Sequence, residues 1–80
     1  MSGTDQSPVG LVGRIVVASR GAAGPGEVKV LIRGGTEHYI ARSREPIEVG
    51  ATVIVLAETG PRSVEVSPWD DPLGSAPATP

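Results

Sequence analysis

Between residues 10 and 67 the chain consists of five short runs rich in Val, Ile and Leu, and Gly or Pro separates each run from the next. Apolar residues alternate with other residues along these runs, which is the two-residue period of a half-buried β-strand and not the period of a helix. The alternation predicts five strands, at residues 10–18, 27–33, 36–41, 52–57 and 63–66. A chain built in this way is expected to form an all-β fold.

Glycines between the runs predict how the strands connect. Gly34-Gly35 predicts a two-residue hairpin turn, because both central residues of a type I′ turn have positive φ. Gly60-Pro61 predicts a second reversal, between the last two runs. Gly13, inside the first run, permits the bend that a strand needs when it serves both halves of a small barrel. This placement of glycine and proline fits a small five-stranded Greek-key barrel of the OB type.

The barrel is expected to occupy residues 9–69 as one domain. Residues 1–8 and the Pro-rich residues 70–80 contain too few apolar side chains to offset the entropy of ordering them. Both ends are therefore expected to be disordered tails. A chain of 80 residues is too short for a second core. The domain is expected to be a monomer.

The alternation also predicts which side chains point into the barrel. Residues 45–50 are too few for a full helix, and they are expected to form a single turn that plugs one end with Ile47 and Val49. The inward residues expected on the strands are Leu11, Ile15, Val17, Val28, Val30, Ile32, His38, Ile40, Val53, Val55, Val64 and Val66.

Composition excludes several classes of protein. The chain has no Cys, and so neither a disulfide nor a thiolate zinc site. Its formal charge of −2 gives no general attraction to nucleic acid or to anionic membranes. The apolar run at residues 53–57 is far shorter than the ~20 residues of a membrane-spanning helix, and residues 1–8 do not resemble a secretory signal. A cytoplasmic domain without membrane insertion is expected.

No set of residues indicates catalysis or a cofactor. His38 is the sole imidazole, with Glu37 as its only neighbouring carboxylate, which favours a structural role. The glycine-rich loop at residues 21–26 leads into a strand, whereas a phosphate-binding loop leads into a helix. Asp70 and Asp71 lie in a Pro-flanked segment without a rigid frame. The sequence therefore predicts a protein that is not an enzyme, with no catalytic, metal or cofactor site.

Four segments carry a family resemblance: Gly10-Leu-Val-Gly13, Gly26-Glu-Val-Lys-Val30, Glu45-Pro-Ile-Glu-Val-Gly50, and Thr52-Val-Ile-Val-Leu56 followed by Gly60 and Val64-Glu-Val66. Over residues 9–67 this pattern resembles the C-terminal soluble domain of NfeD-like proteins. The resemblance implies an OB-fold domain that is normally tethered behind membrane helices and works with stomatin-like or flotillin-like membrane scaffold proteins. The chain departs from the pattern in its longer first loop, residues 21–26, and in His38, where a large aromatic is common.

The outward side of the first three strands is the candidate interaction face. It combines aliphatic and basic side chains with one ring, and its expected members are Val12, Arg14, Val16, Lys29, Leu31, Arg33 and Tyr39. The aliphatic members suit contact with a protein, and an unidentified protein is the expected partner. The resemblance to NfeD-like proteins implies that this partner is membrane-associated.

A single-stranded nucleic acid is the alternative ligand. OB folds usually bind oligonucleotides on this side, where the basic residues would contact phosphates and Tyr39 would stack on a base. Trp69, the second aromatic of the chain, either covers an apolar patch of the barrel or is an exposed anchor for a partner.

Overall fold

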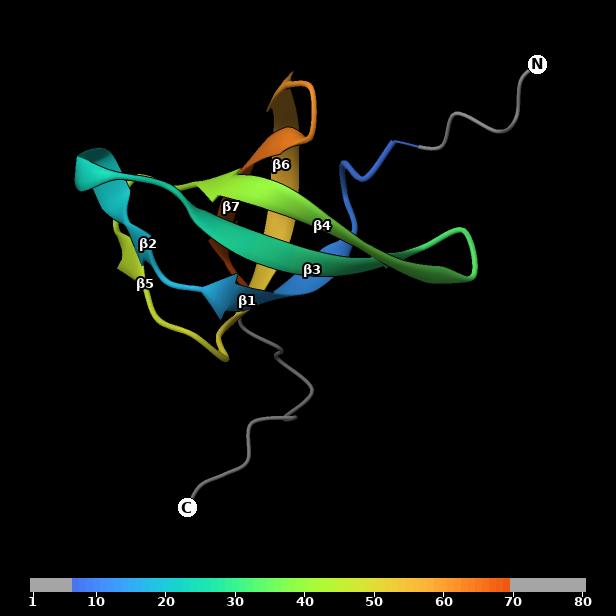
Figure 1. Ribbon diagram of the computed structural model, residues 1–80, viewed down its shortest axis with the longest axis horizontal. Coiled ribbons are helices and arrows are strands. Elements are labelled where there is room, and N and C mark those ends of the chain that lie inside the picture. Colours follow the sequence, from blue (N-terminus) through green and yellow to red (C-terminus); the bar gives the residue numbers. More distant parts are fainter. Residues whose placement is uncertain (1–6, 70–80) are drawn as a thin grey trace.

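The computed structural model describes residues 7–69 and contains seven strands and one short 3-10 helix (Figure 1). In chain order these are β1 (Val12–Val17), β2 (Ser19–Arg20), η1 (Gly21–Ala23), β3 (Gly26–Ile32), β4 (Gly35–Arg42), β5 (Pro46–Ile47), β6 (Thr52–Gly60) and β7 (Ser63–Pro68).

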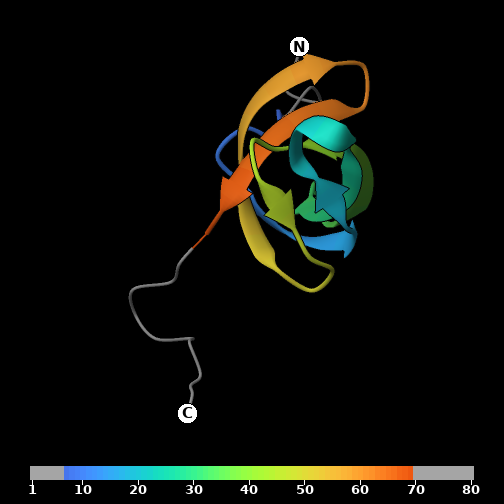
Figure 2. The ribbon, with the colours of Figure 1, turned by 90° about the vertical axis from the view of Figure 1, so that its left-hand side faces the viewer.

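Five of the strands form a closed barrel in the order β1-β3-β4-β7-β6. Neighbouring strands are antiparallel except β4 and β7, which pair in parallel. The two-residue strands β2 and β5 pair with each other, and Figure 2 shows this pair in front of the barrel. The predicted fold class, an all-β five-stranded barrel, is confirmed. The predicted tails lie outside the described residues except for Ser7 and Pro8.

Strand β1 holds the two halves of the barrel together. Gly13 pairs with Val30 of β3 on one side and with Val53 of β6 on the other. A Cβ atom on Gly13 would lie 2.7 Å from the carbonyl oxygen of Lys29, so a larger residue would push the two strands apart. The glycine therefore permits the close approach of β1 and β3.

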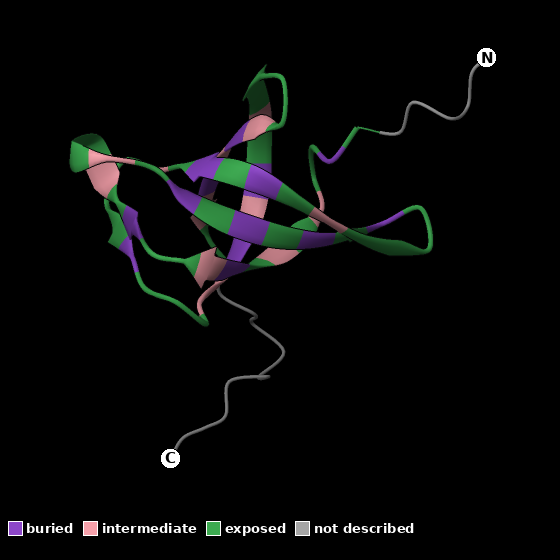
Figure 3. Ribbon diagram, viewed as in Figure 1, coloured by how far each residue is buried: buried purple, intermediate pink, exposed green. Residues whose placement is uncertain are grey.

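The core consists mainly of β-branched side chains from the inner face of the barrel. Along β3 every second residue is buried, and Figure 3 shows the same alternation on β4. Branched aliphatics suit this pleated inner surface because their side chains fill space with little rotamer freedom to lose. The buried apolar residues are Ile15, Val28, Val30, Ile32, Tyr39, Ala41, Ile47, Val53, Val55, Val64 and Val66.

The prediction for β4 was wrong: Tyr39 and Ala41 point into the core, and His38 and Ile40 are exposed. The hairpin turn is formed by Arg33 and Gly34, with φ of 55° and 79°, and not by Gly34 and Gly35. Ile32 therefore lies opposite Gly35, and the register continues to Val28 opposite Tyr39. Residues directly opposite each other share a face, so Tyr39 joins Val28 inside the barrel.

Two other inward predictions were also wrong. Ile15 lies opposite Val28 and Val17 lies opposite Glu27, so the register shifts across one extra residue of β1. Such a bulge changes the side to which the following residue points, and Val17 is exposed. Val49 is exposed as well, whereas Ile47, held in β5, is buried as predicted. The end of the barrel is thus plugged by a short strand pair and not by a helical turn.

Candidate functional site

The structure places four of the predicted face residues side by side on the outer surface of β1 and β3. Val12 and Leu31 are 42% and 69% exposed, and Arg14 and Lys29 are exposed beside them. These four, together with Gly13, Thr36 and Thr52, line an open depression of about 250 Å³. The depression lies on the outer surface of β1 and β3, between Thr36 of β4 and Thr52 of β6.

The other predicted members have different positions. Val16 is half-buried at the bulge of β1, and Arg33 is exposed in the hairpin turn. Tyr39 is only 8% exposed and belongs to the core, so its prediction as a face residue was wrong. His38 takes the neighbouring outward position, because the register of the hairpin turns the odd-numbered residues of β4 inward.

A row of basic side chains crosses the middle of this face. Arg14 lies directly opposite Lys29, and Lys29 lies directly opposite His38. Side chains at directly opposite positions have Cβ atoms about 4.5–5.5 Å apart. We call these three residues the basic row. Neither Arg14 nor Lys29 forms a salt bridge with another described residue.

Aliphatic side chains lie on both sides of the basic row. Val12 and Leu31 form one aliphatic flank, two residues along their strands from Arg14 and Lys29. Val17 and Ile40 form the other flank, with exposed fractions of 48% and 43%, and both lie opposite Glu27. The face therefore combines a cationic centre with one aliphatic border and with a second border in which Glu27 separates two aliphatic side chains.

Trp69 lies at one edge of the same face. Its backbone N–H donates a hydrogen bond of 2.9 Å to the carbonyl oxygen of Thr52, which continues the pairing of β7 with β6. Thr52 in turn lies opposite Arg14. Trp69 is 42% exposed, so it leaves part of its ring available for contact.

A second group of residues, not predicted from the sequence, surrounds Arg62 in the turn between β6 and β7. Its Nη1 atom donates to Glu37 Oε1 at 3.0 Å, and its Nη2 atom donates to the carbonyl oxygen of His38 at 2.9 Å. Its guanidinium carbon lies 5.0 Å from the centre of the Tyr39 ring. We call these four residues the Arg62 cluster. No pattern in the sequence predicts it, because the contacts join positions far apart in the chain.

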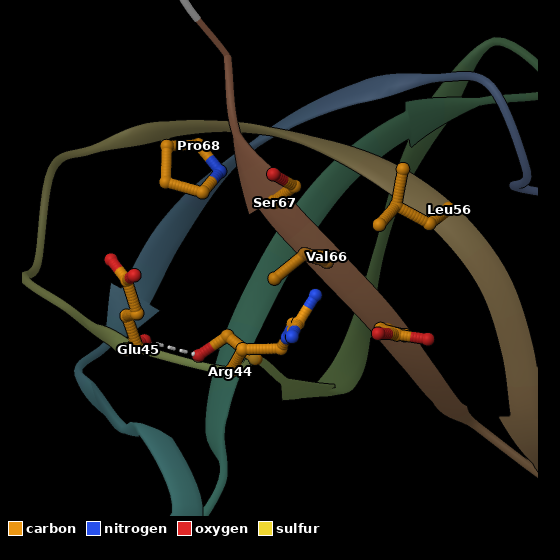
Figure 4. A pocket seen from close by; sticks show the side chains of 8 residues that line it. Arg44, Glu45, Leu56, Val66, Ser67 and Pro68 are labelled. Atoms are coloured by element: carbon orange, nitrogen blue, oxygen red, sulfur yellow. Dashed lines mark hydrogen bonds between the residues drawn. The ribbon is translucent and has the colours of Figure 1, made fainter.

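A cleft of about 500 Å³ opens where β4 and β7 separate (Figure 4). Pairing of the two strands ends at Arg42 and Glu65, and the chain after β4 diverges from β7. Ser43 Oγ donates to the carbonyl oxygen of Glu45 at 2.7 Å and thus shapes the wall of the cleft. Arg44 shares the lining with Glu45 and Glu65, so no single sign of charge dominates it.

Two hydroxyl groups near this cleft, those of Ser19 and Ser43, have structural partners. Ser19 Oγ and Ser43 Oγ are 2.6 Å apart, and Ser19 Oγ also accepts the backbone N–H of Gly21 at 3.2 Å. Among residues 7–69, no three His, Cys, Asp or Glu side chains are grouped so that they could hold a metal ion. The described part of the chain also lacks any helix with the length and apolar character needed to cross a bilayer.

Comparison with known proteins gives a consistent result. Residues 12–67 match the family model described as the NfeD C-terminal domain. The C-terminal domain of stomatin operon partner protein 1510-C from Pyrococcus horikoshii is 30% identical with a TM-score of 0.62, and the match covers 80% of this chain and 91% of that one. The soluble domain of the NfeD protein YuaF from Bacillus subtilis is 31% identical with a TM-score of 0.62, over 74% of this chain and 70% of that one. A search of curated proteins found no match.

Proposed function

The chain belongs to the family of NfeD C-terminal domains, and from this premise we propose that it is a non-enzymatic module that binds a stomatin-like or flotillin-like membrane scaffold protein. One similar structure is that of a protein named as a stomatin operon partner, which supports this class of partner. The binding surface in this proposal is the outer face of β1, β3 and β4.

The observation that carries the proposal is the grouping of exposed aliphatic side chains on this face. Single exposed apolar residues are normal on any protein surface. Here Val12 and Leu31 lie beside one another on neighbouring strands, while Val17 and Ile40 are exposed on either side of Glu27. Contiguous apolar surface with charged residues next to it is typical of protein interfaces.

A single-stranded nucleic acid is the alternative ligand for the same face. The basic row would contact phosphates in that case. Burial of Tyr39 weakens this alternative, because the ring expected to stack on a base is inside the barrel. Among the described residues, Trp69 and the imidazole of His38 are the exposed rings that remain.

Nuclear magnetic resonance can test the proposal directly. The ¹⁵N-labelled domain is titrated with the membrane-free part of a stomatin-like protein from the same organism. The expected result is a set of chemical-shift changes that is largest at Val12, Lys29 and Leu31. Shifts confined to the cleft near Glu65, or no shifts at saturating concentration, would contradict the proposal. A mixed-sequence single-stranded oligonucleotide that shifts the face more strongly would favour the alternative.

A further inference from the structure

The basic row is an unfavourable arrangement for the isolated domain. Like charges directly opposite each other on a sheet are destabilising, and Arg14 and Lys29 occupy such positions. Two other cations of the barrel have an acid near them: Arg42 lies opposite Glu65, and Arg62 pairs with Glu37. The basic row thus differs from these two positions, where opposite charges lie together.

The face itself offers little compensation. On the outward side of β3 the acidic residue is Glu27, two positions away from Lys29 and opposite the aliphatic Val17 and Ile40. Neither Arg14 nor Lys29 has a salt bridge within residues 7–69. Their positive charge is therefore available to a ligand from outside.

We propose that this face binds an extended, acidic segment of the partner protein in which a carboxylate and an aliphatic side chain lie two residues apart. The inference rests on the proposed function and specifies the chemistry of the partner. The carboxylates pair with Arg14 and Lys29, and the aliphatic side chains contact the flank formed by Val12 and Leu31.

The spacing of the face supports an extended segment. Lys29 and Leu31 are two residues apart on β3 and point to the same side, which places them about 7 Å apart along the strand. An extended peptide presents its side chains i and i+2 to one side with the same separation. An acidic residue above Lys29 thus places the next side chain on that face above Leu31.

Synthetic peptides test the chemistry without knowledge of the natural partner. A peptide that repeats Ser-Glu-Ser-Ile is compared with a matched peptide in which Gln replaces Glu, with dissociation constants from titration of the ¹⁵N-labelled domain. The Glu peptide is expected to change the chemical shifts of Arg14, Lys29 and Leu31. The Gln peptide is expected to bind at least about tenfold more weakly, since charge-assisted hydrogen bonds are lost.

A charge reversal on the domain gives the matched test. Lys29→Glu is expected to weaken binding of the Glu peptide by at least about tenfold, because a repulsive contact replaces an attractive one. It also places an acid opposite Arg14, so the variant is expected to melt no lower than the parent domain. Arg44→Glu is the control, since it makes the same charge change in the cleft, away from the face. The control is expected to change the dissociation constant less than about twofold.

Each outcome decides a separate question. Equal binding of the Glu and Gln peptides, or equal losses in Lys29→Glu and Arg44→Glu, would overturn the inference. So would an oligonucleotide that shifts the basic row while neither peptide does, and this result would favour nucleic acid. If neither peptide binds but the stomatin-like protein shifts the face, only the inference on chemistry fails. If the Glu peptide binds but the stomatin-like protein does not, only the proposed function fails.

Discussion

Arg62 and the two basic-row residues Arg14 and Lys29 have opposite surroundings. Arg62 contacts a carboxylate at 3.0 Å, a carbonyl oxygen at 2.9 Å and an aromatic ring at 5.0 Å. Arg14 and Lys29 lie opposite each other and have no salt bridge among the described residues. The comparison separates a cation that contacts other parts of the fold from two cations that have no salt bridge among residues 7–69 and that we propose contact a partner.

The position of Arg62 explains why the fold needs its contacts. Its carbonyl oxygen accepts the backbone N–H of Ile40 at 2.7 Å, next to the parallel pairing of β4 with β7 that closes the barrel. Its φ of 56° is in the left-handed region, which is costly for a residue with a Cβ atom. The side-chain contacts with Glu37, His38 and Tyr39 offset that cost and hold the turn against β4.

Removing the ring beneath Arg62 is the change with the largest expected effect. Tyr39→Ala leaves a cavity in the core and removes the surface on which the guanidinium lies. The free energy of unfolding, measured by denaturant titration, is expected to fall by about 3–5 kcal/mol. Tyr39→Phe keeps the ring and is expected to cost about 1 kcal/mol or less. A Tyr39→Ala domain as stable as its Phe counterpart would show that the ring is not part of the core.

Substitution of Arg62 is expected to have a smaller effect. Arg62→Ala loses an exposed ion pair, a hydrogen bond and a cation–π contact, which together predict a loss of about 1–2 kcal/mol in unfolding free energy. Arg62→Gly loses the same contacts but relieves the backbone strain. It is therefore expected to be about 0.5–1 kcal/mol more stable than Arg62→Ala.

Thermal and denaturant unfolding of both Arg62 variants provide the measurement. An Arg62→Gly domain less stable than Arg62→Ala would mean that the left-handed backbone is not strained. If both variants equalled the parent domain, the Arg62 cluster would have no stabilising role, and its contrast with the basic row would disappear.

Most of the barrel could be predicted from the sequence, because its inner residues are aliphatic and alternate. The inward positions Val28, Val30 and Ile32 of β3 and Val53 and Val55 of β6 are all buried as predicted. In these strands the residues that are most apolar are also the ones that the strand geometry turns toward the core. The strand pair β2 and β5 was not predicted, since a two-residue strand has no measurable period.

Strand β4 is the element for which hydropathy misled the prediction. Ile40 is more apolar than Ala41, and yet Ala41 is fully buried. The turn contained the necessary information: any two-residue turn between these strands places an even-numbered residue of β3 opposite an odd-numbered residue of β4. With Val28 and Val30 inside, Tyr39 has to point inward as well. The Arg62 cluster could not be predicted from the sequence, because it depends on the pairing of β4 with β7.

Charge reversal within the basic row is expected to raise stability. Lys29→Glu replaces repulsion from Arg14 with attraction, which predicts a gain of up to about 1 kcal/mol in unfolding free energy at low salt. Lys29→Gln removes the repulsion alone and is expected to lie between the parent domain and Lys29→Glu. The gain is expected to shrink as salt is added, because these side chains are exposed. A loss of stability in both variants would show that Lys29 has a stabilising role like that of Arg62.

The smallest expected effect on stability belongs to the aliphatic flank of the basic row. Leu31 is 69% exposed, so Leu31→Ser is expected to change the unfolding free energy by no more than about 0.5 kcal/mol. Leu56→Ser is the matched control, because Leu56 is also an exposed leucine but lines the cleft beside β7. Both variants are expected to fold with nearly the parent stability, and only Leu31→Ser is expected to weaken binding of the acidic peptide, since it removes apolar contact area next to Lys29. Equal binding losses in the two variants would mean that exposed leucines attract the peptide wherever they lie. A clear loss of stability in Leu31→Ser would instead mean that this flank stabilises the fold, as Tyr39 is expected to do. The proposed difference between the residues that stabilise the barrel and the residues that contact a partner would then disappear.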